Sequence, residues 1–195
     1  MRRMRLINLV IILMLVPSLL LWSRDSHGAD KKKYERTVAS YQVPDLMLTN
    51  QNGQRVRLRE ILISEKPVFL QFIYATCTTI CPILSAGYAN LQNRMGQDLK
   101  NIRLVSITID PDHDTPEVMK EYLKRYNAKP GWEFLTGSRD EIKAVMKAFY
   151  TDVPNKMSHY PLTLLRSPDD GYWIRLFGFM STQELKEEYH KVWEK

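Results

Sequence analysis

The sequence predicts an α/β protein, a three-layer α/β/α sandwich around a central mixed sheet. The chain has 195 residues, long enough for one domain with its own core and too short for two full-sized ones. Hydrophobic residues make up 44% and charged residues 26%, which excludes a disordered, collagen-like or multi-span membrane chain. Apolar runs of strand length alternate with stripes at helical spacing, which indicates strands and helices in turn.

The N-terminal 28 residues predict a signal peptide or an N-terminal membrane anchor. Arg2, Arg3 and Arg5 precede an uncharged apolar run over residues 7–22. This run is shorter than the ~20 residues of a typical membrane-spanning helix, so cleavage after Gly28 and retention both stay open. The segment has no cysteine for lipid attachment, which excludes a bacterial lipoprotein. We therefore expect an exported protein, in the periplasm or on the outer face of the cytoplasmic membrane.

The remaining chain divides into a linker over 29–40 and a folded domain over 41–195. The formal net charge is +6, but four basic residues and one acid lie within the first 28 positions. The small excess left on the domain gives no case for nucleic acid as a partner.

The first half of the domain predicts a strand pair, a buried strand and a helix. Residues 46–48 and 56–58 flank a turn at 50–53. Residues 67–74 are almost all apolar, as in a central strand buried on both faces. A helix should follow with Pro82 in its first turn.

The second half alternates strands with capped helices. We expect a strand over 101–109, a helix beginning at Thr115-Pro116 and a strand over 132–135. Two later helices should begin at the capping boxes Ser138/Glu141 and Ser181/Glu184. Between these two helices, 162–166 and 172–179 are predicted strands around a turn. This order is that of a thioredoxin-like sandwich.

Cys77 and Cys81 are the two cysteines of the chain, with three residues between them. They follow strand 67–74 where a helix begins, and a helix N-terminus favours the thiolate. A disulfide closing so small a ring would remove only about 2 kcal/mol of unfolded-state entropy. The alternative is a structural disulfide or two buried thiols. We favour a redox-active pair in which Cys77 is the more exposed sulfur with the lower pKa and Cys81 resolves.

Several blocks of the chain, taken together, resemble the Sco/SenC family. The blocks are FIYATCTTICP, SITIDPDHDTPEVMKEY, WEFLTGSRDEI and a lone His159 followed nine residues later by Pro168, within residues 44–195. Sco/SenC proteins are thioredoxin-fold proteins that deliver copper to cytochrome oxidase. The resemblance implies that Cys77, Cys81 and His159 are copper ligands. Two thiolates and an imidazole are a soft donor set suited to Cu(I), and to Cu(II) with a further donor.

The implied function is that of an exported copper metallochaperone, which is not an enzyme. Its implied partners are the copper-site subunit of a cytochrome oxidase or another respiratory protein, a copper donor protein, and the membrane through the N-terminal segment. The alternative is a thiol–disulfide reductase that uses Cys77 and Cys81, with Pro161 where thioredoxins place a cis-proline. A peroxiredoxin-like peroxidase is less favoured, because its pattern needs proline where Tyr74 stands.

Two positions depart from the usual family pattern. Thr78-Thr79 replaces a Pro-Asp pair that often follows the first cysteine, and Ser158 replaces an aspartate that often precedes the histidine. The carboxylates that could tune the thiolates or orient the imidazole are therefore absent at these positions.

Four polar or soft side chains near these blocks have simpler interpretations than metal ligation. We interpret His113 as a polar loop residue and Met157 as packed or exposed. Asp110 and Asp114 are interpreted as a helix cap and a turn acid rather than as partners of the site.

Overall fold

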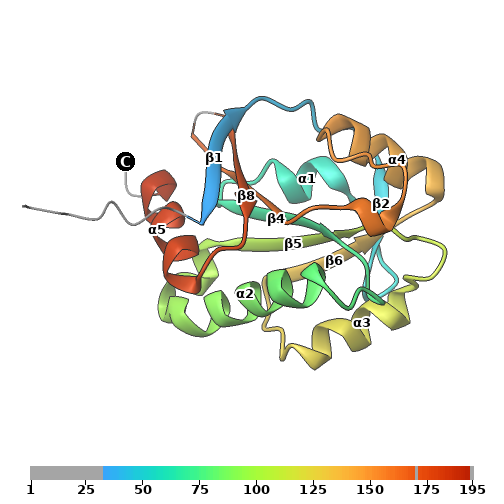
Figure 1. Cartoon of the computed structure of the whole chain (residues 1–195), viewed down its shortest axis with the longest axis horizontal. Coiled ribbons are helices and arrows are strands. Elements are labelled where there is room, and N and C mark those ends of the chain that lie inside the picture. Colours follow the sequence, from blue (N-terminus) through green and yellow to red (C-terminus); the bar gives the residue numbers. More distant parts are fainter. Residues whose placement is uncertain (1–32, 170, 194–195) are drawn as a thin grey trace, which may run out of the picture. The chain divides into compact units, whose positions relative to one another are not determined.

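The computed structural model describes residues 33–169 and 171–193. A mixed sheet of eight strands runs through this part of the chain, with helices on both faces (Figure 1). The elements in chain order are β1 (Tyr34–Ala39), β2 (Met47–Asn50), β3 (Arg55–Arg57), α1 (Leu58–Leu62), β4 (Val68–Ile73), α2 (Ile80–Met95), the 3-10 helix η1 (Gly96–Asn101), β5 (Arg103–Thr108), α3 (Pro116–Arg125), β6 (Trp132–Thr136), α4 (Arg139–Ala148), the 3-10 helix η2 (Lys156–Ser158), β7 (Leu162–Arg166), β8 (Trp173–Gly178) and α5 (Thr182–Trp193).

The sheet order is β1-β8-β7-β4-β5-β6-β2-β3. β4 pairs parallel with β5 and antiparallel with β7, and β5 pairs parallel with β6. All six residues of β4 are buried, as its continuous apolar sequence predicts for a central strand. The predicted mixed sheet is confirmed.

Two hydrophobic clusters, one on each face of the sheet, make the three layers. Successive side chains of a strand point to opposite faces, so Phe69 belongs to one cluster and Leu70 to the other. Phe69 packs among side chains of α2, α3 and α5, whereas Leu70 packs among those of α1 and α4. In Figure 1, α2 and α3 lie below the sheet and α1 and α4 above it. The predicted α/β/α sandwich is confirmed.

The predicted helix starts are also confirmed. The Thr115 side chain caps α3 by accepting the Val118 N–H, and a proline follows at the first helical position. At α4, Ser138 and Glu141 form both bonds of the capping box. These interactions set where each helix begins relative to the strand before it.

The predicted linker over 29–40 is wrong for residues 34–39. These residues form β1, which pairs antiparallel with β8 from Tyr34 opposite Gly178 to Ala39 opposite Trp173. Because β8 would otherwise end the sheet with unpaired backbone groups, the extra strand covers that edge. β1 is mostly exposed, so its sequence lacks the alternation of apolar and polar residues that predicts a strand.

Three short helices were not expected from the sequence. Residues 58–62 form α1, so the strand expected over 56–58 ends at Arg57, and residues 96–101 and 156–158 form η1 and η2. Segments this short carry too little periodicity to be recognised as helix.

The predicted signal or anchor segment, residues 1–28, lies outside the described residues. Among the helices of residues 33–169 and 171–193, none has the length and apolar character needed to cross a bilayer.

Candidate metal centre

The two cysteines lie where β4 leads into α2. Cys77 is in the connecting loop, and Cys81 lies in the first turn of the helix. The Cys77 N–H donates to the Tyr74 carbonyl at 3.2 Å, which curls the loop back under the strand end. The Cys81 N–H donates to Cys77 Sγ at 3.4 Å. The sulfur thus accepts a hydrogen bond from one of the backbone N–H groups that have no partner within the first turn of a helix.

The two thiols are free and differ in environment. Cys77 is 6% exposed and Cys81 is fully buried. Burial opposes ionisation of Cys77, but hydrogen bonds from Cys81 and Thr79 outweigh it and lower the pKa of Cys77 from 9.0 to about 7. Burial and the hydrogen bond to Cys77 raise the pKa of Cys81 above its usual range. Cys77 is thus the more exposed of the two thiols and the one with the lower pKa, which is the order expected from the sequence.

His159 reaches the cysteines from the loop between α4 and β7. Its Nδ1 lies 2.7 Å from the Lys156 carbonyl oxygen, and its Nε2 lies 3.1 Å from Cys81 Sγ. A carbonyl oxygen only accepts, so Nδ1 carries the proton and Nε2 keeps its lone pair. The ring also meets Tyr74 edge-on, with 5.2 Å between centroids. Burial lowers the pKa of His159, although the bond to Lys156 opposes the shift, and this favours the neutral imidazole.

The ligand atoms of Cys77, Cys81 and His159 all lie within 4.8 Å of one another. No other set of three cysteine, histidine or carboxylate side chains comes together in this way within the described residues. Bonds of about 2.3 Å to sulfur and 2.0 Å to nitrogen separate neighbouring ligand atoms by roughly 3.5–4 Å. The three side chains therefore fit around one small ion, and their softness favours Cu(I).

The sequence model of the SCO1/SenC family matches residues 35–194. The chain belongs to the SCO1/SenC family. It is 32% identical over 114 residues to the SCO1 protein homolog of Bacillus subtilis, covering 56% of this chain and 58% of that protein. The chain thus spans less than two thirds of that relative's length.

Two solved structures of the family share its fold. ScoI of Bradyrhizobium japonicum with copper bound is 26% identical, with a TM-score of 0.62 over 79% of this chain and 98% of that chain. BsSco, a member of the Sco family of cytochrome c oxidase assembly proteins, is 25% identical, with a TM-score of 0.66 over 80% of this chain and 95% of that chain. The thioredoxin-like fold and the Sco/SenC resemblance are therefore confirmed.

Asp114 supports the cysteine side of the centre in this SCO1/SenC protein. The buried carboxylate accepts the Ala75 N–H at 3.2 Å and the Thr108 hydroxyl at 2.5 Å. Burial raises the pKa of Asp114, although these hydrogen bonds oppose the shift. The interpretation of one of the two acids as a helix cap is wrong, because Thr115 caps α3. Asp110 does begin a turn, since its carbonyl accepts the N–H groups of His113 and Asp114. Asp114 instead holds the loop that carries Cys77.

Asp110 supports the histidine side. One carboxylate oxygen lies 2.5 Å from Lys156 Nζ, and the other lies 2.9 Å from His113 Nδ1. The Asp110 N–H also donates to Thr108 Oγ1 at 2.9 Å, which connects it to Asp114. The segment after β5 therefore contacts both loops of the metal centre. His113 itself is 66% exposed and outside the ligand group, as expected of a polar loop residue.

Met157 and Pro161 border the centre without entering the ligand group. Met157 is 67% exposed, as expected, and its Sδ accepts the Tyr74 hydroxyl at 3.2 Å. The described residues contain no cis peptide bond, so Pro161 does not reproduce the cis-proline of thioredoxins.

Sequence reasoning missed Lys156 and Tyr74, which flank the imidazole. Lys156 contacts Asp110, 46 residues away in the sequence, and Tyr74 contacts Met157, 83 residues away. No local sequence motif predicts either contact.

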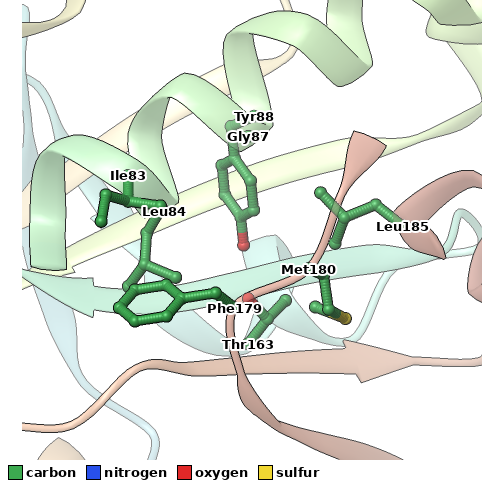
Figure 2. Close-up of a pocket in the computed structure, with 8 residues that line it drawn as sticks. All are labelled: Ile83, Leu84, Gly87, Tyr88, Thr163, Phe179, Met180 and Leu185. Atoms are coloured by element: carbon green, nitrogen blue, oxygen red, sulfur yellow. The ribbon is translucent and has the colours of Figure 1, made fainter. Parts of the chain in front are cut away.

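An apolar hollow lies between α2 and the segment after β8 (Figure 2). Its lining residues are Ile83, Leu84, Gly87, Tyr88, Thr163, Phe179, Met180 and Leu185. The Tyr88 hydroxyl, which has no hydrogen-bond partner among the described residues, is directed into it (Figure 2). This lining has no cysteine, histidine or carboxylate.

Proposed function

We propose that this chain is an exported copper metallochaperone that delivers copper to a respiratory cytochrome oxidase or matures its copper site. The observation that carries the proposal is the group of two free thiols and one imidazole lone pair within 4.8 Å. Membership of a family whose ScoI relative has copper bound supports the choice of metal.

Cys77 and Cys81 hold the ion as thiolates, and His159 completes the site through Nε2. The lowered pKa of Cys77 makes one thiolate available near neutral pH. Metal binding displaces the proton of Cys81, whose pKa burial has raised, so copper binding releases protons. When the pair loses two electrons and two protons to an oxidant, the sulfurs join in a disulfide that offers no thiolate. Thiol oxidation therefore couples to copper release.

The proposed partners follow from this chemistry and from the N-terminus. Copper arrives from a donor protein and leaves for the copper-site subunit of an oxidase or another respiratory protein. BsSco is described as a member of the Sco family of cytochrome c oxidase assembly proteins, which supports this class of recipient. The basic residues before the apolar run 7–22 support export and association with the outer face of the cytoplasmic membrane.

Copper titration of the purified full chain tests the proposal. The reduced chain should bind one copper and the oxidised chain none, because the thiolates supply most of the soft-donor character. Cys77→Ser and Cys81→Ser should each abolish binding. His113→Ala removes an exposed imidazole outside the ligand group and should bind normally. Unchanged stoichiometry in either cysteine variant would refute the ligand assignment.

A thiol–disulfide reductase is the second candidate, favoured by the lowered pKa of Cys77. A reductase should form a mixed disulfide through Cys77 when Cys81 is replaced by serine. It should also need Pro161 for substrate docking but not His159. Oxidase activity in cells that carry His159→Ala or Pro161→Ala separates the two functions. Full activity without His159, together with failure without Pro161, would favour the reductase.

A further inference from the structure

We propose that Lys156 is a positioning residue for the metal centre. Its side chain, anchored by Asp110, fixes the backbone carbonyl that orients His159 toward the cysteines. The inference rests on the proposed function in one respect only, because its test measures the binding of copper at this site.

The orientation of the imidazole depends on a single acceptor. The Lys156 carbonyl oxygen accepts the His159 Nδ1–H at 2.7 Å and lies 3.3 Å from the His159 backbone nitrogen. If that carbonyl moves, the ring loses the bond that selects its tautomer and directs Nε2 at Cys81.

The side chain of the same residue is tied to the body of the fold. Lys156 Nζ lies 2.5 Å from an Asp110 carboxylate oxygen, and Asp110 lies two residues after the end of β5. The Asp110 side chain is only 9% exposed and that of Lys156 is 35% exposed. Such a pair is less screened by solvent than a pair on the open surface.

Tyr74 gives Lys156 a second anchor next to the imidazole. Lys156 Nζ lies 5.3 Å from the centroid of the Tyr74 ring, a cation–π distance. The edge-on contact between Tyr74 and His159 places this ring beside the imidazole as well. Lys156 thus reaches the histidine by two routes, through its own carbonyl and through the ring it covers.

The loop that carries His159 needs such an anchor. Between the end of α4 and the start of β7, its one regular element is the short 3-10 helix η2, which begins at Lys156. The residue directly before the histidine is Ser158, whose side chain brings no charge to the ring. The ion pair between Lys156 and Asp110 therefore ties the start of η2 to the segment that follows β5.

Replacement of the charge at position 156 tests the inference on the purified, reduced full chain. Lys156→Met keeps the aliphatic stem and removes the ion pair. It should still bind one copper, but with about 10- to 100-fold lower affinity in competition with a chelator. Its Cu(II) electron paramagnetic resonance spectrum should shift toward that of His159→Ala. Lys156→Arg retains the charge and should restore most of the affinity and the spectrum.

Two control variants separate positioning from general effects of charge. Lys120→Met removes an exposed lysine of α3, and His113→Ala removes the other partner of Asp110. Both should leave affinity and spectrum unchanged. Asp110→Asn should reproduce the Lys156→Met result. If Asp110→Asn fails to fold, Lys156→Met still decides, because its side chain is partly exposed.

A Lys156→Met chain with wild-type affinity, within about twofold, and a wild-type spectrum would overturn the inference. Failure of the proposed function would look different. In that case the wild-type chain would bind no copper, or Cys77→Ser would bind it normally.

Discussion

The thiol of Cys77 should be about half ionised at neutral pH, and its alkylation rate should show it. Hydrogen bonds from Cys81 and Thr79 outweigh burial and lower the pKa of Cys77 from 9.0 to about 7. At pH 7 the thiolate fraction is then about one half, against about 1% for an ordinary thiol with the unshifted pKa of 9.0. Between pH 6 and pH 8 this fraction rises about tenfold, whereas that of an ordinary thiol rises about ninetyfold.

Iodoacetamide labelling of the reduced, metal-free chain, followed by mass spectrometry of the two cysteine peptides, measures this directly. Cys77 should be labelled first with a midpoint near pH 7, and Cys81 slowly because it is buried and its pKa is raised. Thr79→Val removes a hydroxyl 3.6 Å from Cys77 Sγ and should shift the midpoint upward. Thr78→Val, at the neighbouring exposed position, should leave it unchanged. A Cys77 midpoint near pH 9, or earlier labelling of Cys81, would refute this account of the thiols.

Further changes probe the imidazole, the core, a helix cap and a buried carboxylate. His159→Ala should leave disulfide formation intact but weaken copper and alter its Cu(II) spectrum, and an unaltered spectrum would remove the imidazole from the site. Leu70→Ala in the fully buried centre of β4 should lower the free energy of unfolding in urea by about 2–5 kcal/mol. Val38→Ala, at an exposed position of β1, is the control, and equal losses would contradict the assigned core. Ser138→Ala removes the capping-box bond that the Ser138 hydroxyl accepts from the Glu141 N–H and should cost about 0.5–2 kcal/mol in the same assay, so an unchanged midpoint would show that this bond is not needed. Burial opposes ionisation of Glu188, but its hydrogen bonds outweigh it and lower the pKa below the ordinary 4.5. The stability it contributes is present above that ordinary value and is lost as pH falls through the lowered one, so Glu188→Gln should flatten the acid limb of stability against pH.

The cysteine half of the metal centre was predictable from the sequence because it is local. The buried strand over 67–74, Pro82 and the spacing of Cys77 and Cys81 all lie within one strand–loop–helix unit. The histidine half is not local, since 78 residues separate Cys81 from His159. The sequence placed His159 in the site only through the family resemblance. In the structure, the pairing of β4 with β7 brings the loop that carries His159 next to the loop that carries Cys77.

The sequence by itself determined the order of the predicted strands and helices and where the capped helices begin. Apolar periodicity and caps such as Ser138 with Glu141 are set within a few neighbouring residues. Only the tertiary structure decided that residues 34–39 pair with β8, and that Asp110 and Asp114 support the two loops of the metal centre. The physical reason is that an edge strand or a buried carboxylate is stabilised by what the folded sheet places opposite it. Those partners lie far away in the sequence and leave no local pattern.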